Sequence, residues 1–179
     1  MDLLELAALL PKLTARVARD VIVDALGAPG RFHERALVAA SVARFEALLA
    51  RDIADGVRPG LLFEQRDLLA LRLRTFARTP LARRLGRLRR ASVLRRGAAA
   101  KPFDALLRTR AGRVLALLVR PMPTGEARLD IYRAARGAIE RFEGREPLVA
   151  LMLIDPLSGA SQILRLDEVT GLQRGSTAA

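Results

Sequence analysis

The stretch that decides the fold runs from Lys101 to Tyr132 and reads KPFDALLRTRAGRVLALLVRPMPTGEARLDIY. It contains two apolar runs, Phe103–Leu107 and Val114–Val119, on either side of the turn-forming triplet Arg110-Ala111-Gly112. Apolar runs separated by a short glycine-containing segment are typical of a β-hairpin. We therefore expect two antiparallel strands here.

A helix is expected directly after this hairpin. The proline-rich residues 121–123 end the second strand, and Thr124 supplies a side-chain oxygen that can cap a helix beginning at Gly125 or Glu126. The stretch thus predicts the order strand, turn, strand, helix.

Upstream of the hairpin the spacing of apolar residues predicts mainly helices. Leucines and valines recur at three- and four-residue intervals over residues 2–26, 31–55 and 61–78. Pro11 is expected to divide the first of these helices, because a proline inside a helix costs about 3 kcal/mol. Thr79-Pro80 begins a short fourth helix, with the threonine as N-cap. Residues 91–96 read as a strand and 97–100 as a loop.

Downstream, a helix over about 125–142 leads to the apolar run 147–154, which predicts a strand covered on both faces. A turn at 155–159 and an alternating strand at 162–166 follow. The expected fold class is α+β, with a mixed sheet flanked by helices. We divide the chain into an N-terminal helical segment (1–58), an α/β core (59–170) and a disordered tail (171–179).

This arrangement resembles the core of the PD-(D/E)XK nuclease superfamily, and within it the RecB-like nuclease domain. The resemblance rests on the α-βββ-α-β order, on Asp104 in the first hairpin strand and on Tyr132 in the helix. Such a nuclease carries a metal-binding Asp on the first strand, acid-x-Lys on the next, and Gln-x-x-x-Tyr on the helix. The resemblance places these motifs at Asp104, Leu118-Val119-Arg120 and Arg128 to Tyr132, over roughly residues 60–166.

Two departures from the family pattern decide the expectation about catalysis. Leu118 replaces the second acid and Arg120 replaces the lysine. Paired carboxylates hold the divalent cation that polarises phosphate and activates water, so Asp104 alone makes a poor magnesium site. Arg120 stays protonated and cannot act as a base, although it can grip phosphate. We therefore expect a relic nuclease site, formed by Asp104, Arg120, Arg128 and Tyr132, without catalytic residues, bound metal or cofactor.

Composition narrows the class of protein further. The 179 residues are 51% apolar and include no cysteine and one histidine, which excludes disulfides, thiolate metal sites and a cysteine nucleophile. No uncharged stretch approaches the roughly 20 residues needed to cross a bilayer, and acidic Asp2 and Glu5 do not suit a signal peptide. We expect a cytoplasmic protein with no membrane role.

Positive charge is concentrated in one third of the chain. The formal net charge is +12, and residues 66–120 contain 16 basic and two acidic side chains, a local net charge of +14. Arginine matches phosphate oxygens with a planar fork of donors. The expected partner is DNA, contacted at its backbone without sequence preference, as for a nucleoid protein. The leading contact residues are Arg83, Arg84, Arg87, Arg89, Arg90, Arg95 and Arg96.

Other interpretations remain open. The arginine excess can reflect GC-rich codons on solvated helix faces. The protein can also be an interaction or assembly module, including a homo-oligomer, whose arginines meet an acidic protein. A third possibility is a metal-dependent nuclease with a relocated acid, drawn from Asp104, Glu64 and Asp130. His33, near the start of the second helix, is either close to such a metal or a residue of the helix cap.

Overall fold

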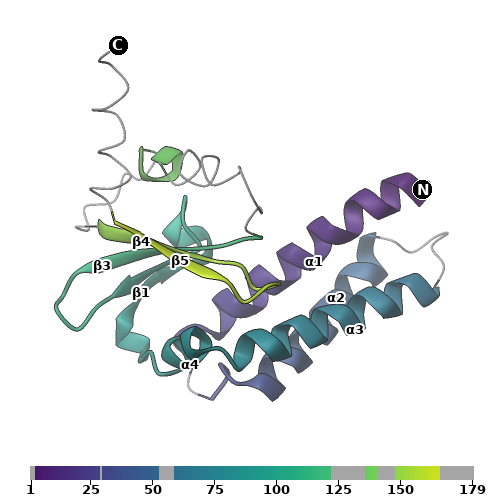
Figure 1. Ribbon diagram of the computed structural model, residues 1–179, viewed down its shortest axis with the longest axis horizontal. Coiled ribbons are helices and arrows are strands. Elements are labelled where there is room, and N and C mark those ends of the chain that lie inside the picture. The colour runs from purple at the N-terminus through teal and green to yellow at the C-terminus, as the bar shows by residue number, and fades with distance from the viewer. Residues whose placement is uncertain (1–2, 29, 53–58, 122–135, 141–147, 166–179) are drawn as a thin grey trace, which may run out of the picture.

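A computed structural model describes residues 3–28, 30–52, 59–121, 136–140 and 148–165. Four α-helices come first: α1 (Leu3–Ala25), α2 (Glu34–Asp52), α3 (Pro59–Ala77) and α4 (Pro80–Gly86). The 3-10 turn η1 (Arg90–Ser92), strand β1 (Val93–Arg96) and the 3-10 turn η2 (Gly97–Ala100) follow. The remaining strands are β2 (Ala105–Arg108), β3 (Val114–Val119), β4 (Leu148–Ile154) and β5 (Ser161–Arg165). The fold is α+β, as predicted (Figure 1).

The five strands form one mixed sheet in the order β1-β2-β3-β4-β5. Strands β2 and β3 pair antiparallel, with Leu106 opposite Ala116, which confirms the predicted hairpin. Strand β4 runs parallel to β3, and β5 returns antiparallel to β4. The hairpin turn includes Gly112 at φ +75°, a conformation that glycine adopts without steric cost.

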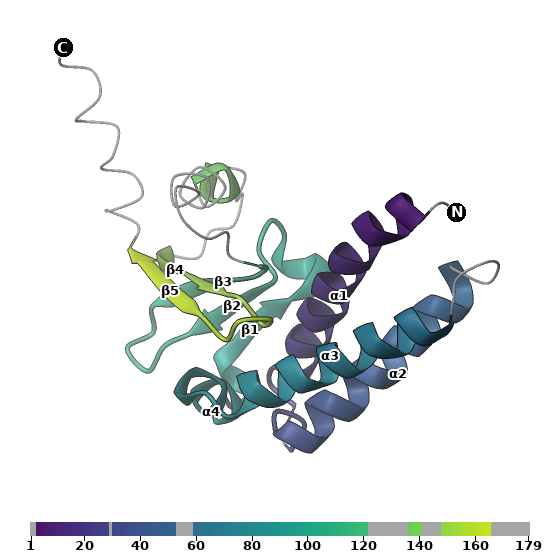
Figure 2. The same cartoon turned by 45° about the vertical axis from the view of Figure 1, so that its right-hand side comes forward.

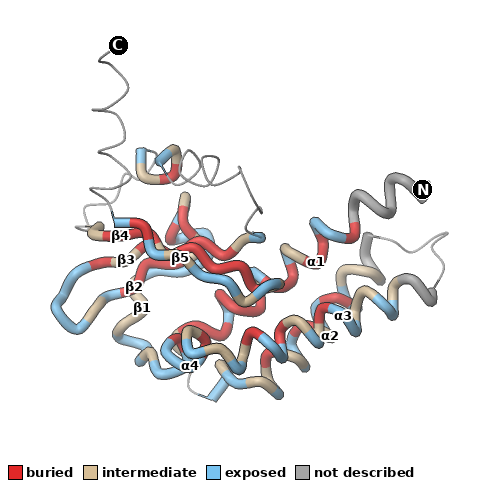
Figure 3. The backbone as a smooth tube through the Cα atoms, in the orientation of Figure 1, coloured by how far each residue is buried: buried red, intermediate tan, exposed pale blue. Residues whose placement is uncertain are grey.

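The sheet buries side chains on both faces. On one face Leu107, Leu117 and Val119 join the cluster formed by the helices, which includes Val17 and Ile22 of α1. The opposite face holds a second cluster with Leu106, Leu118 and Leu153, against which Ala138 of the helical stretch 136–140 packs. Figure 2 shows the helical layer on one side of the sheet and residues 136–140 on the other. Figure 3 shows the buried residues following the sheet and the adjoining half of α1.

Helix α1 differs from the prediction, because it continues through Pro11. Proline removes one backbone donor, but the apolar stripe passes the proline without interruption: Leu10 and Leu13 are 4% and 7% exposed. This burial offsets the lost hydrogen bond. Further along, the Thr14 hydroxyl donates to the Leu10 carbonyl at 2.7 Å. The prediction of two separate pieces is therefore wrong.

The other elements depart from the predictions only at their ends. Helix α4 ends at Gly86, earlier than the arginine-rich run suggested, and β1 begins at Val93 after a 3-10 turn. The expected loop at residues 97–100 is a second 3-10 turn. The predicted helix at 125–142 is described only at residues 136–140, which are helical, and the predicted tail from residue 171 lies outside the described residues. No helix in the described ranges combines the length and the apolar character needed to span a membrane.

Candidate nucleic-acid interface

Helix α4 presents arginines because its sequence caps one end and buries one face. Thr79 accepts a hydrogen bond from the Ala82 N–H at 3.2 Å, and Pro80 occupies the first turn, where a missing donor has no cost. Ala82 and Leu85 are buried against the core. The charged residues of this helix, Arg83 and Arg84, are exposed, as is Arg87 at its C-terminal end.

A groove of about 1160 Å³ lies between α4, the β2–β3 hairpin and strands β4 and β5. Its lining combines arginines, called here the arginine rim, with apolar side chains, called the apolar floor. The arginine rim consists of Arg84, Arg87, Arg89, Arg108 and Arg110. The apolar floor consists of Leu85, Leu88, Leu107, Leu115, Met152 and Ile163. Among the described residues, no aspartate or glutamate lines this groove.

The rim arginines lack acidic partners, unlike several arginines of the helical layer. On the helices Arg44 pairs with Asp24 at 2.7 Å, and Arg78 pairs with Glu34 at 2.9 Å. Arg66 likewise contacts Glu46 at 3.1 Å. Within the described part of the chain, none of the five rim arginines forms an ion pair or a side-chain hydrogen bond. Five unneutralised cations around one hollow repel each other, and an anionic ligand would relieve that repulsion.

The structure brings together only some of the predicted contact residues. Arg84, Arg87 and Arg89 line the groove, whereas Arg83 and Arg90 are exposed outside its lining. Arg96 donates from Nη1 to the carbonyls of Asp24 and Leu26, both at 2.9 Å, so its guanidinium also closes the C-terminal end of α1. Arg95 lies on the same strand, β1, and is exposed.

Arg108 and Arg110 complete the rim, although sequence reasoning did not single them out. They belong to the same basic stretch, but they lie at the end of β2 and in the hairpin turn, some 20 residues beyond α4 in sequence. They line the groove because the β2–β3 hairpin lies beside α4 in the fold. The sequence showed only the excess positive charge of residues 66–120. That excess does not indicate which arginine side chains lie close together in the fold.

Asp104 and Arg120 lie near each other, just before β2 and just after β3. The Asp104 carboxylate accepts the Val119 N–H at 2.7 Å, which ties the start of β2 to the end of β3. The Arg120 N–H donates to the Ile154 carbonyl at 2.9 Å, next to β4. Arg19 of α1 approaches the same carboxylate, with 3.6 Å between Nε and Oδ1, and also contacts Asp20 at 3.3 Å. Sequence reasoning did not foresee Arg19 in this cluster.

Burial dominates the electrostatics of this cluster. The pKa of Asp104 is raised from its ordinary value because burial disfavours the carboxylate, and the Val119 hydrogen bond and the charges of Arg19 and Arg120 oppose this effect. The pKa of Arg120 is lowered, again by burial, and the Asp104 charge counteracts that shift. Both shifts show that the two charged groups are partly withdrawn from water.

Leu118, which stands where the nuclease pattern has its second acid, lies in the core. Leu118 is 7% exposed and belongs to the cluster on the face covered by residues 136–140. Among the described residues, no three His, Asp or Glu side chains lie close enough together to hold a metal ion. The predicted site residues Arg128 and Tyr132, and the alternative acid Asp130, lie outside the described residues.

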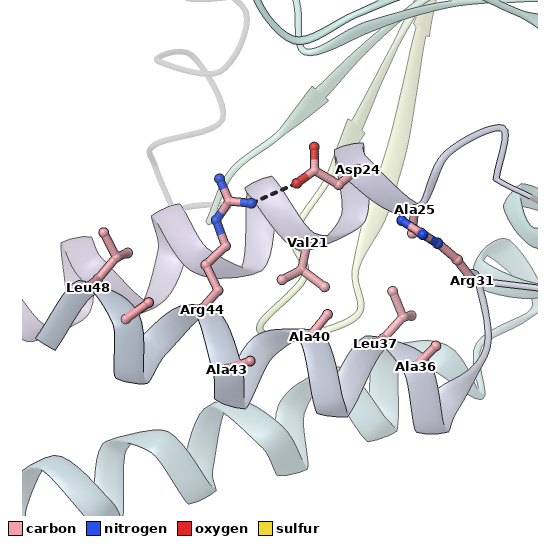
Figure 4. A pocket seen from close by; sticks show the side chains of 11 residues that line it. Val21, Asp24, Ala25, Arg31, Ala36, Leu37, Ala40, Ala43, Arg44 and Leu48 are labelled. Atoms are coloured by element: carbon pink, nitrogen blue, oxygen red, sulfur yellow. Dashed lines mark hydrogen bonds and ion pairs between the residues drawn. The ribbon is translucent and has the colours of Figure 1, made fainter. Parts of the chain in front are cut away.

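The two remaining metal candidates serve other roles or face solvent. His33 Nδ1 accepts the Ala36 N–H at 3.3 Å and so caps the start of α2. Glu64 is exposed on α3. A smaller hollow between α1 and α2, of about 580 Å³, is lined mainly by alanines, and its Arg44 is paired with Asp24 (Figure 4). Its composition suits helix packing more than anion binding.

The groove and the Asp104 cluster lie at opposite ends of β2. Asp104 directly precedes the strand and Arg108 ends it, so the two residues are four positions apart in the sequence. At about 3.3 Å per residue, this corresponds to roughly 13 Å. The arginine rim therefore does not surround Asp104, the residue that the resemblance assigned to a nuclease-like site. A scan against protein-family models and searches of curated proteins and solved structures found no match to this chain.

Proposed function

We propose that this protein binds DNA without cleaving it, contacting phosphates through the arginine rim. The observation that carries the proposal is the convergence of five arginines on one groove without an acidic neighbour among the described residues. Guanidinium groups pair with phosphate oxygens through parallel hydrogen bonds. A protein that contacts only the backbone gains affinity without sequence preference.

The pairing of arginines elsewhere argues against codon bias as a full explanation of the charge. Arg44, Arg66 and Arg74 of α2 and α3 are matched by nearby acids, whereas Arg35 and Arg72 on the same helices form no ion pair with a described residue. The groove lacks such compensation. Codon bias by itself gives no reason for five arginines and no described acid to meet at one groove.

A decayed PD-(D/E)XK core is the fold assignment we propose beneath this function. Three features support it: the antiparallel meander β1-β2-β3, the parallel strand β4 beside β3, and the meeting of Asp104 with the end of β3. The lack of catalysis follows from the residue types. One carboxylate, already hydrogen-bonded and faced by Arg19, cannot replace a pair that holds a divalent cation.

A salt titration of DNA binding tests the proposal. We expect a dissociation constant of micromolar or lower for a fluorescein-labelled 20-base-pair duplex at low salt, measured by fluorescence anisotropy. If all five rim arginines contact phosphates, the logarithm of affinity should fall with the logarithm of salt with a slope of about −4.5. Affinity would then drop about 500-fold between 50 and 200 mM salt. No binding to this duplex or to a labelled single strand at low salt would refute the proposal.

Cleavage needs a separate measurement. The protein should leave supercoiled plasmid intact with magnesium or manganese, as should an Asp104→Ala variant. Cleavage by the wild type that disappears in Asp104→Ala would instead establish a metal-dependent nuclease with a relocated acid.

An assembly role is the second candidate, favoured by exposed apolar side chains on α3. Phe63 and Leu71 are 53% and 55% exposed, and Leu68 lies nearby at 36%. Self-association that persists at high salt and disappears on Leu71→Ser would support this role. A monomer at all concentrations tested by sedimentation would exclude the homo-oligomer.

A further inference from the structure

The groove is more than a cluster of charges, because apolar side chains line it together with the arginines and with the hydroxyl residues Thr79, Ser92, Thr109 and Ser161. Leu88 from the α4 side, Leu115 of β3 and Met152 of β4 are half-buried and line the hollow. Ile163 of β5 completes this surface and is 58% exposed. A ligand that only brought phosphates would leave this apolar surface without a partner.

The arginine rim and the apolar floor define the chemistry of the ligand. Such a ligand must present anionic groups to the arginine rim and apolar surface to the apolar floor. Double-stranded DNA offers little apolar surface to the apolar floor, because its bases are stacked inside the helix and its outer surface is the charged backbone. Pressing phosphates onto an aliphatic surface would remove water from them without compensation.

We propose that the groove takes an unpaired DNA strand, with its phosphates on the arginine rim and its bases turned onto the apolar floor. In a single strand the bases are free to rotate away from the backbone, so both parts of the groove find a partner. This inference rests on the proposed function and specifies its ligand.

The floor differs from the usual platform for single strands. Its described residues include no aromatic side chain, so bases would be held by burial of apolar surface and not by ring stacking. We therefore expect moderate affinity, little dependence on base identity, and a steep dependence on salt. Five phosphate contacts to a single strand correspond to a slope of about −3.5.

The test compares labelled dT20 with a GC-clamped 20-base-pair duplex at the same salt concentrations. The duplex carries two phosphates for each one of the strand, so attraction by charge alone would favour the duplex. Tighter binding of dT20 would therefore report the contribution of the floor. We expect that preference in the wild-type protein.

Ile163→Ser probes the floor without disturbing the core, since the side chain is 58% exposed. It should weaken dT20 binding about fivefold, consistent with losing part of one buried aliphatic side chain, and leave duplex binding unchanged. The matched control is Leu71→Ser, a residue of similar exposure (55%) on α3. It should alter neither affinity, and thermal melting would verify that both variants are folded.

The outcomes separate this inference from the proposed function. Equal or tighter binding of the duplex, or unchanged dT20 binding in Ile163→Ser, would overturn the single-strand inference while DNA binding itself stands. If the protein bound neither dT20 nor the duplex, both the proposed function and this inference would be refuted.

Discussion

Replacing Arg84, Arg87 and Arg89 together by glutamine removes three of the five charges of the arginine rim. All three side chains are exposed, and none forms an ion pair with a described residue. The substitution should therefore preserve the fold, and unfolding in urea should show stability equal to the wild type or slightly higher, because like charges are removed.

The magnitude follows from the number of phosphate contacts that remain. Arg108 and Arg110 would leave two contacts, for which the slope of log affinity against log salt is about −1.8 instead of about −4.5 on duplex DNA. Between 50 and 200 mM salt the affinity of the variant should fall only about 12-fold, compared with about 500-fold in the wild type. The slope is more informative than a single dissociation constant, because it reports the number of phosphates neutralised.

The assay is fluorescence anisotropy at four or more salt concentrations, with a control of equal charge. Arg16, Arg31 and Arg35 are exposed on or near α1 and α2, outside the groove. Their triple replacement by glutamine removes the same three charges and should leave the slope near the wild-type value. An unchanged slope in the rim variant, or an equal reduction in the control, would refute the assignment of phosphate contacts to the groove.

Three further predictions concern stability. Thr79→Ala should lower the free energy of unfolding by about 1 kcal/mol, because the Ala82 N–H loses its cap; a loss below about 0.3 kcal/mol in urea unfolding would contradict that role. Leu117→Ala should cost about 2–5 kcal/mol, since Leu117 is 0% exposed, whereas Leu71→Ala at 55% exposure should change stability by less than about 0.5 kcal/mol; similar losses in the two variants would contradict the described core. Burial raises the pKa of Asp104, so its contribution to stability is complete below about pH 3.9 and is lost as pH rises through the raised folded-state value. Asp104→Asn should flatten that decline above about pH 3.9, and identical pH profiles of unfolding free energy for the two proteins would contradict a raised pKa at Asp104.

Elements specified by neighbouring residues were predictable. The hairpin follows from two apolar runs around a glycine that adopts positive φ, and the start of α4 follows from a threonine and a proline in adjacent positions. The apolar run of β4 indicated a strand covered on both faces, and its side chains do join both clusters: Leu151 and Leu153 on one face, Ile154 on the other. Each of these signals acts over a few residues, so no tertiary information is needed to interpret it.

Features that depend on packing between distant elements were not predictable. Helix α1 passes through Pro11 because its apolar face is buried on both sides of the proline, at Leu10 and Leu13. Helix propensity contains no information about such burial. Arg19 reaches Asp104 from a helix 85 residues earlier in the sequence.

The sequence by itself determined the α+β class, the strand order along the chain and the place of the excess charge, because these depend on local pattern and composition. Only the tertiary structure decided which arginines share a groove and which are engaged within the protein. Arg96 and Arg108 have the same chemistry, but the first bonds to α1 carbonyls and the second turns into the groove. That difference arises because the sheet folds back beside α4, and no local pattern specifies the partner of a guanidinium group.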